Sequence, residues 1–243
     1  FTLRDVDSIT SIGVSTKRDD PTSIGKFGVG FKAVFAYTNT PEIHSGEFHF
    51  RIHDLVVPET DGVAQAVMPV RATKFNFPFN HPKKGPDKAI EEIESGLRAL
   101  GDNTLLFLTH IHTIEYLLTD GSFGSLVRID HEGGHIEIRA RHPGGHDTVS
   151  HWLRFQKEVE VADENGGLKS CRIAIAYSLV EDEDTKKHRS AWKIVPLENG
   201  QVSIYFPADK ETSNLRFHIH APFASTVARD SVRDCNANHQ LRD

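Results

Sequence analysis

The sequence predicts an α+β protein in two parts: residues 1–114 mix helix and strand, and residues 115–243 are rich in strands. Three observations support this division. A glycine-rich loop over residues 23–32 leads into an apolar segment, residues 86–100 have the spacing of an amphipathic helix, and short alternating segments follow one another after residue 126.

Helices and strands alternate in the first part. Apolar residues at helical spacing predict a helix from Asp5 to Ile12, and a second helix follows the glycine loop from Gly28 to Tyr37. Phe48 to Ile52 alternates as a strand. Pro86 to Leu100 is predicted as an amphipathic helix, and Leu105 to Ile111 as a further helical segment.

The second part has the pattern of an antiparallel meander. Leu126–Ile129 and Ile136–Arg139 flank Gly133-Gly134 as a hairpin. Further strands are predicted over Trp152–Val161, Arg172–Leu179, Trp192–Val195, Val202–Phe206 and Leu215–His220.

The glycine-rich loop indicates phosphate chemistry. Gly25, Gly28 and Gly30 allow the backbone to approach a ligand closely, so that successive N–H groups can converge on an anion. Their order is the reverse of the dinucleotide fingerprint, and the loop lacks the Gly-Lys-Ser/Thr ending of a P-loop. Upstream, Ser15, Thr16 and Lys17 supply the hydroxyls and the cation that a triphosphate needs.

Three motifs together resemble the GHKL superfamily of ATPases, and within it the sacsin and NO VEIN type of heat-shock-ninety-like ATPase domain. They are Ile-Gly-Val-Ser-Thr-Lys at residues 12–17, the segment from Ile24 to Phe35, and Pro-Glu-Ile-His-Ser-Gly at residues 41–46. The resemblance implies a partial Bergerat-type α/β sandwich, a mixed sheet covered by helices, followed by the β-rich module.

The resemblance also implies a site for ATP and magnesium. Thr73 is expected on the strand whose threonine supports adenine recognition. The residues expected to contact the nucleotide are Ser15, Thr16, Lys17, Gly25, Lys26, Phe27, Gly28, Val29, Gly30, Phe31 and Thr73. An arginine of a downstream module reaches the γ-phosphate in some relatives, which makes Arg229 a candidate for that contact.

Family members carry a Glu and an Asn on a helix ahead of the loop, and then an Asp-Gly segment that reads adenine. No such residues precede Phe1. We therefore expect the chain to be a fragment whose partners are the nucleotide and the remaining domains of a larger parent. We assign no catalytic residue in it, and we expect ATP binding by the chain alone to be weak or absent.

Composition limits the other functions. The net charge of -6 gives no electrostatic support for nucleic-acid binding by the chain as a whole. Whether a local basic patch binds nucleic acid is left open. Two distant cysteines, Cys171 and Cys235, argue against a disulfide scaffold or a zinc ribbon. No segment has the length of a membrane span, and an intracellular location is expected.

Two alternatives to an ATPase remain. The first is a catalytically inactive, nucleotide-free scaffold or interaction domain. The second is a metal-dependent hydrolase built on the 15 histidines. His110 and His112, like His218 and His220, would share a face if they lie on strands, but neither pair has a third ligand in sequence, so no metal site is predicted.

Overall fold

The computed structural model of the chain describes residues 1–11, 30–65, 69, 71–162, 168–182, 192–225, 231–235, 238–239 and 241. The chain divides into two compact units, unit 1 (Phe1–Ser95) and unit 2 (Gly96–Asp243). The predicted division at residue 114 stays a prediction.

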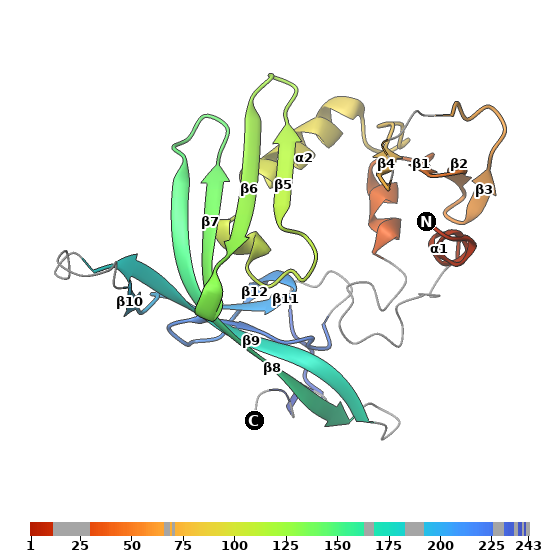
Figure 1. The fold of residues 1–243 in the computed structure, drawn as a ribbon. Coiled ribbons are helices and arrows are strands. Elements are labelled where there is room, and N and C mark those ends of the chain that lie inside the picture. The colour runs from red at the N-terminus through yellow and green to blue at the C-terminus, as the bar shows by residue number, and fades with distance from the viewer. Residues whose placement is uncertain are drawn as a thin grey trace. The chain divides into compact units, whose positions relative to one another are not determined.

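Unit 1 contains short helical elements and a four-stranded sheet (Figure 1). Its elements are α1 (Leu3–Ile9), the 3₁₀-helix η1 (Phe31–Ala36), β1 (Glu42–Ser45), β2 (Phe48–His53), β3 (Val57–Glu59), β4 (Thr73–Asn76) and α2 (Pro86–Arg98), whose last turn belongs to unit 2. Thr2 and Asp5 form a capping box that starts α1. At its other end the hydroxyl of Thr10 donates to the Val6 carbonyl at 2.8 Å, competing with the backbone for that acceptor.

The sheet of unit 1 has the strand order β3-β2-β1-β4 and buries one face. The register places Ile43 opposite both Phe50 and Phe75, so these three side chains lie on the same face. Buried Ile43, Phe50 and Ile52 form its core, and the partly buried side chains packed against them are Val6, Ile9, Phe31, Phe35 and Phe48. Helical residues of α1 and η1 therefore cover the apolar face.

The predicted α+β fold with a helix-covered α/β sandwich is wrong, because the described chain is rich in strands and its helical elements are few. All three strand pairings of this sheet are antiparallel, whereas the sandwich required a mixed sheet. The physical reason is local: Gly46, with a φ of 59°, closes a tight hairpin between β1 and β2, and such a hairpin forces antiparallel pairing. The covering elements are also short, with 7 residues in α1 and 6 in η1. Where a helix was predicted from Gly28 to Tyr37, the described residues form the 3₁₀-helix η1.

Unit 2 is built on a nine-stranded sheet with the order β12-β11-β13-β9-β8-β7-β6-β5, in which β10 also pairs with β9. Its other helical elements are the 3₁₀ turns η2 (Asp102–Leu105) and η3 (Glu132–Gly134). Its strands are β5 (Thr113–Leu117), β6 (Phe123–Asp130), β7 (His135–Arg141), β8 (Thr148–Ala162), β9 (Leu168–Glu181), β10 (Trp192–Val195), β11 (Gln201–Ile204), β12 (Phe206–Thr212) and β13 (His218–His220).

Five consecutive strands of this sheet, β5 to β9, form an antiparallel meander, as the sequence predicted. Figure 1 shows β8 and β9 as a long twisted hairpin. The predicted β6–β7 hairpin is confirmed, and Gly133 and Gly134 in its turn have φ values of 72° and 81°. The later strands do not continue the meander: β11 pairs with β13 in parallel, so the mixed sheet of this protein lies in unit 2.

The predicted helix from Leu105 to Ile111 is also wrong. Only the short turn η2 forms, and the chain from Leu106 to His112 is irregular although Leu106, Phe107 and Leu108 are buried. The run of apolar residues that suggested a helix is explained by burial, because this irregular segment crosses the core. Phe107 packs there with Ile138 and Trp152.

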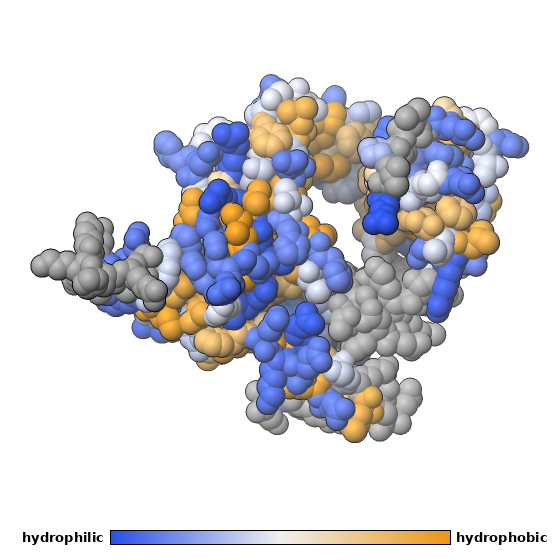
Figure 2. All heavy atoms as spheres, in the orientation of Figure 1, coloured by the Kyte–Doolittle hydropathy of each residue, from blue (hydrophilic) through white to orange (hydrophobic). Residues whose placement is uncertain are grey.

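Exposed apolar surface is found at the tip of the β5–β6 hairpin (Figure 2). Leu117 and Phe123 are paired there and are 71% and 39% exposed. A patch of two residues is small enough for an ordinary surface. Among the described residues, no helix is both long and apolar enough to cross a membrane.

Candidate functional site

The predicted nucleotide site is described in part. Eight of its residues lie outside the described residues, namely Ser15, Thr16, Lys17, Gly25, Lys26, Phe27, Gly28 and Val29. Gly30, Phe31 and Thr73 are described, and all three belong to unit 1.

Gly30 precedes η1 and is exposed. Its φ of -58° and ψ of -43° are ordinary right-handed helical values, which any residue can adopt. A Cβ added to Gly30 would meet no described atom within 4 Å. The described residues therefore give no steric or conformational reason for glycine here.

Phe31 is part of an aromatic cluster. Its ring centroid lies 6.4 Å from Phe35, 6.0 Å from Phe75 and 6.4 Å from Phe77. Such edge and tilted contacts stabilise a core. Since the ring is used in packing, a phosphate would meet Phe31 through its backbone.

Thr73 begins β4 at the edge of the sheet and is exposed. It lies opposite Ser45, and the two hydroxyl oxygens are 2.7 Å apart. Because alternate residues of a strand share a face, Thr73 lies on the same face as Phe75, where α1 and η1 pack. The structure thus has an accessible hydroxyl on the helix-bearing face, with one neighbouring hydroxyl to orient it.

Lys32 is the last residue of the glycine-rich loop, and its ammonium group is hydrogen-bonded within the fold. Nζ donates to the carbonyl of Ile9 at 2.7 Å and to that of Leu55. Burial lowers the pKa of Lys32 below its usual value. A cation at the last residue of α1 also interacts favourably with that helix end. Sequence reasoning gave Lys32 no role, and only the folded chain brings Ile9 and Leu55 to it.

Neither histidine pair has the surroundings of a metal site among the described residues. His110 and His112 lie outside strands, so the geometry considered for them is absent. On β13, the Nδ1 of His218 accepts a hydrogen bond from the Gln201 amide at 3.0 Å, and His220 is stacked on Phe107. Burial lowers the pKa of both His218 and His220 to about 4. Within the described part of the chain, no group of three or more His, Cys, Asp or Glu residues could hold a metal ion.

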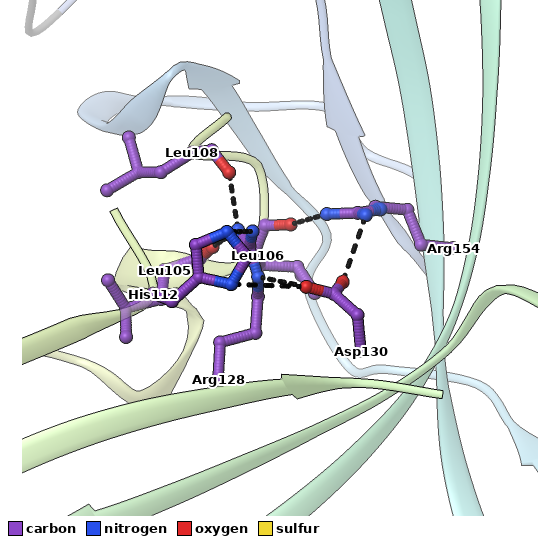
Figure 3. Close-up of polar contacts among 7 residues, drawn as sticks. All are labelled: Leu105, Leu106, Leu108, His112, Arg128, Asp130 and Arg154. Atoms are coloured by element: carbon purple, nitrogen blue, oxygen red, sulfur yellow. Dashed lines mark hydrogen bonds and ion pairs between the residues drawn. The ribbon is translucent and has the colours of Figure 1, made fainter. Parts of the chain in front are cut away.

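Unit 2 also contains a polar cluster around two arginines, of which Arg128 is buried and Arg154 is partly buried (Figure 3). Arg128 donates to the carbonyls of Leu105, at 2.7 Å, and Leu108, while Arg154 donates to that of Leu106 at 2.8 Å. Asp130 accepts from both arginines, at 3.1 Å and 3.2 Å.

The ring of His112 lies in the same cluster, with Nε2 3.2 Å from the Arg128 guanidinium and Nδ1 3.5 Å from the Asp130 carboxylate. The two arginines donate to three carbonyls at the end of η2 and just after it, so the cluster has a structural role. Arg229, the candidate for the γ-phosphate, lies outside the described residues.

A protein family matches the part of the chain that contains the glycine-rich loop. Residues 1–75 match the family described as "Sacsin domain", so this part of the chain is sacsin-like. Two relatives share the similarity. Protein NO VEIN of Arabidopsis thaliana is 26% identical over 252 residues, which cover 96% of this chain and 9% of the relative. Sacsin of Homo sapiens is 25% identical over 165 residues, 52% of this chain and 4% of the relative.

The chain thus spans less than a tenth of the length of either relative. No solved structure is significantly similar to it.

Proposed function

We propose that the first part of this chain belongs to the ATP-binding domain of a heat-shock-ninety-like ATPase of the GHKL superfamily, within a larger protein. One observation carries the proposal. The family match over residues 1–75 contains all three motifs, at residues 12–17, 24–35 and 41–46. Because the sheet is antiparallel, the proposal rests on these motifs and not on the fold.

Two features of unit 1 support the proposal. Among the described residues no atom lies within 4 Å of a Cβ added at Gly30, which suits the close approach of a phosphate that a side chain would hinder. The exposed hydroxyl of Thr73 suits a polar contact to a base. ATP would bring its magnesium ion to this site.

The chemistry of such a site is positioning and charge stabilisation. Backbone amides of the glycine loop would bind the phosphate oxygens, and Lys17 would add a positive charge. Closure of the loop over the nucleotide would exclude bulk water from the site. In the larger protein, this closure would couple nucleotide binding to the neighbouring domains, for which unit 2 is the candidate.

Titration of ATP into the full-length natural protein that carries these residues tests the proposal. We expect binding that magnesium strengthens, and Thr73→Val should weaken it about tenfold, because a site built for a hydroxyl loses a hydrogen bond. Thr73→Ser should restore affinity. Thr113→Val is the matched control, since Thr113 is an exposed strand threonine of unit 2. A full-length protein that binds no ATP would leave the nucleotide-free scaffold as the correct function.

A further inference from the structure

Unit 2 contains a cavity of about 660 Å³ that the proposed function does not use. It lies between the β8–β9 hairpin, β12 and its following loop, β13, and the C-terminal residues Val232 and Leu241. Ligand pockets in proteins commonly have volumes of about 300 to 1,000 Å³, so the cavity has the size of a small-molecule site.

The walls of the cavity are mainly apolar. Phe155, Ile175 and Ile219 lie directly opposite one another on β8, β9 and β13, so their side chains form one row on the same face of the sheet. Phe217 and Phe223 add aromatic surface. Binding of an apolar ligand would therefore remove apolar surface of both the ligand and the cavity walls from water.

Most polar groups at the cavity already have partners in the protein. A carboxylate oxygen of Glu211 accepts from the Val232 amide at 2.7 Å, and the Ser213 hydroxyl donates to the Gly200 carbonyl at 3.0 Å. His220 is 5% exposed, and burial lowers its pKa to about 4, so its ring is neutral at neutral pH. These groups contribute hydrogen bonds to the fold, and the Glu211 carboxylate is the acidic group of the described lining.

Lys157 differs from them. On its face of β8 the neighbouring positions are Phe155 and Val159, and the residue opposite is Ile173, so a lysine interrupts an apolar stripe. The side chain is exposed and lines the cavity. Among the described residues, Lys157 has no ion-pair partner.

We propose that this cavity binds a small molecule with an apolar body and one carboxylate, and that Lys157 pairs with the carboxylate. The apolar row selects the body and the lysine selects the charge. This inference concerns unit 2 and is independent of nucleotide binding in unit 1.

Calorimetric titration of the complete chain with decanoate, below its micelle concentration, tests the proposal. We expect one decanoate per chain and about tenfold weaker binding of decanol, since a partly desolvated charge pair is worth about this factor. Lys157→Gln should weaken decanoate about tenfold and leave decanol unchanged, while Lys157→Arg should retain decanoate binding. Lys193→Gln is the matched control, because Lys193 is also an exposed strand lysine of unit 2.

Three results would overturn the proposal. They are no saturable decanoate binding, equal affinities for decanoate and decanol, or an equal loss of decanoate binding in Lys157→Gln and Lys193→Gln. Thermal melting of each variant checks that it is folded. Since both lysines are exposed, we expect their substitutions to leave the melting temperature within a few degrees of the parent.

Discussion

Acid should destabilise unit 2 through two buried histidines of β13. His218 and His220 are 6% and 5% exposed, and burial lowers the pKa of each to about 4 from its ordinary value of 6.5. The folded state therefore binds fewer protons than the unfolded state in the interval between these values. Stability is full above pH 6.5 and falls as the pH falls toward 4, because the unfolded chain takes up protons first.

The size of the effect follows from linkage. One pKa unit corresponds to about 1.4 kcal/mol, so each histidine should cost the folded state about 2 kcal/mol at pH 5. The pair should then lower the free energy of unfolding by about 4 kcal/mol between pH 7.5 and pH 5. This loss is large against a typical domain stability of about 5 to 15 kcal/mol.

Urea denaturation at pH 7.5, 6 and 5 measures this loss, with tryptophan fluorescence as the probe. Trp152 is suitable because its ring centroid lies 5.0 Å from that of His218. The double variant His218→Asn, His220→Asn keeps an acceptor near each Nδ1 position and removes the titration. It should lose about 4 kcal/mol less than the parent over the same interval.

Burial and the charges of neighbouring histidines also lower the pKa of His135, so both proteins should retain some acid sensitivity. His146→Asn, a change at an exposed residue, is the control and should behave as the parent. Equal acid sensitivity in the parent and the double variant would refute the reasoning.

Three further predictions concern other parts of the chain. Arg128→Met should lower the free energy of unfolding by about 3 kcal/mol in urea denaturation, because the carbonyls of Leu105 and Leu108 lose a buried donor. Gly133→Ala and Gly134→Ala should each cost about 1 kcal/mol for their positive φ, and Gly134→Ala about 1 kcal/mol more. The added Cβ at Gly134 would lie 2.5 Å from the Arg154 carbonyl oxygen, and at Gly133 it meets no described atom within 4 Å, so equal losses by thermal melting would contradict the steric argument. The chain alone should release phosphate from ATP at no more than the background rate. The sequence ahead of the loop does not contain the Glu and Asn of family members, and the loss of one such electrostatic group commonly lowers the rate about a hundredfold. Magnesium-dependent turnover that Gly28→Val abolishes would show that a carboxylate within the chain has taken the catalytic role.

Most strands of unit 2, though not β5 and β12, could be predicted because their signals are local. The alternation in β6 and β7 and the two glycines between them specify a hairpin without reference to the rest of the chain. The segment after η2 could not be predicted in this way. Its apolar residues suggested a helix, but the carbonyls of Leu108 and Leu106 accept from Arg128 and Arg154, which lie 20 and 48 residues away in sequence.

The order in which the strands pair could not be predicted from the sequence either. β4 lies beside β1 although a long connection separates them, and the short strand β13 inserts between β9 and β11. For the candidate site, the glycine motif indicated a phosphate ligand, whereas the role of Lys32 depends on carbonyls of Ile9 and Leu55 that only folding brings together.

The affinity of the full-length protein for ATP, measured for Gly30→Ala beside Gly96→Ala, tests the central claim most directly. Neither added methyl group meets a described atom within 4 Å, and neither glycine has a positive φ, so both variants should melt at or above the temperature of the parent. If phosphates approach the backbone at Gly30, Gly30→Ala should weaken ATP binding at least about tenfold, and Gly96→Ala, on the exposed surface of α2, should leave it unchanged. Unchanged ATP affinity in Gly30→Ala would contradict the proposed site, and no ATP binding by the parent would contradict the proposed function.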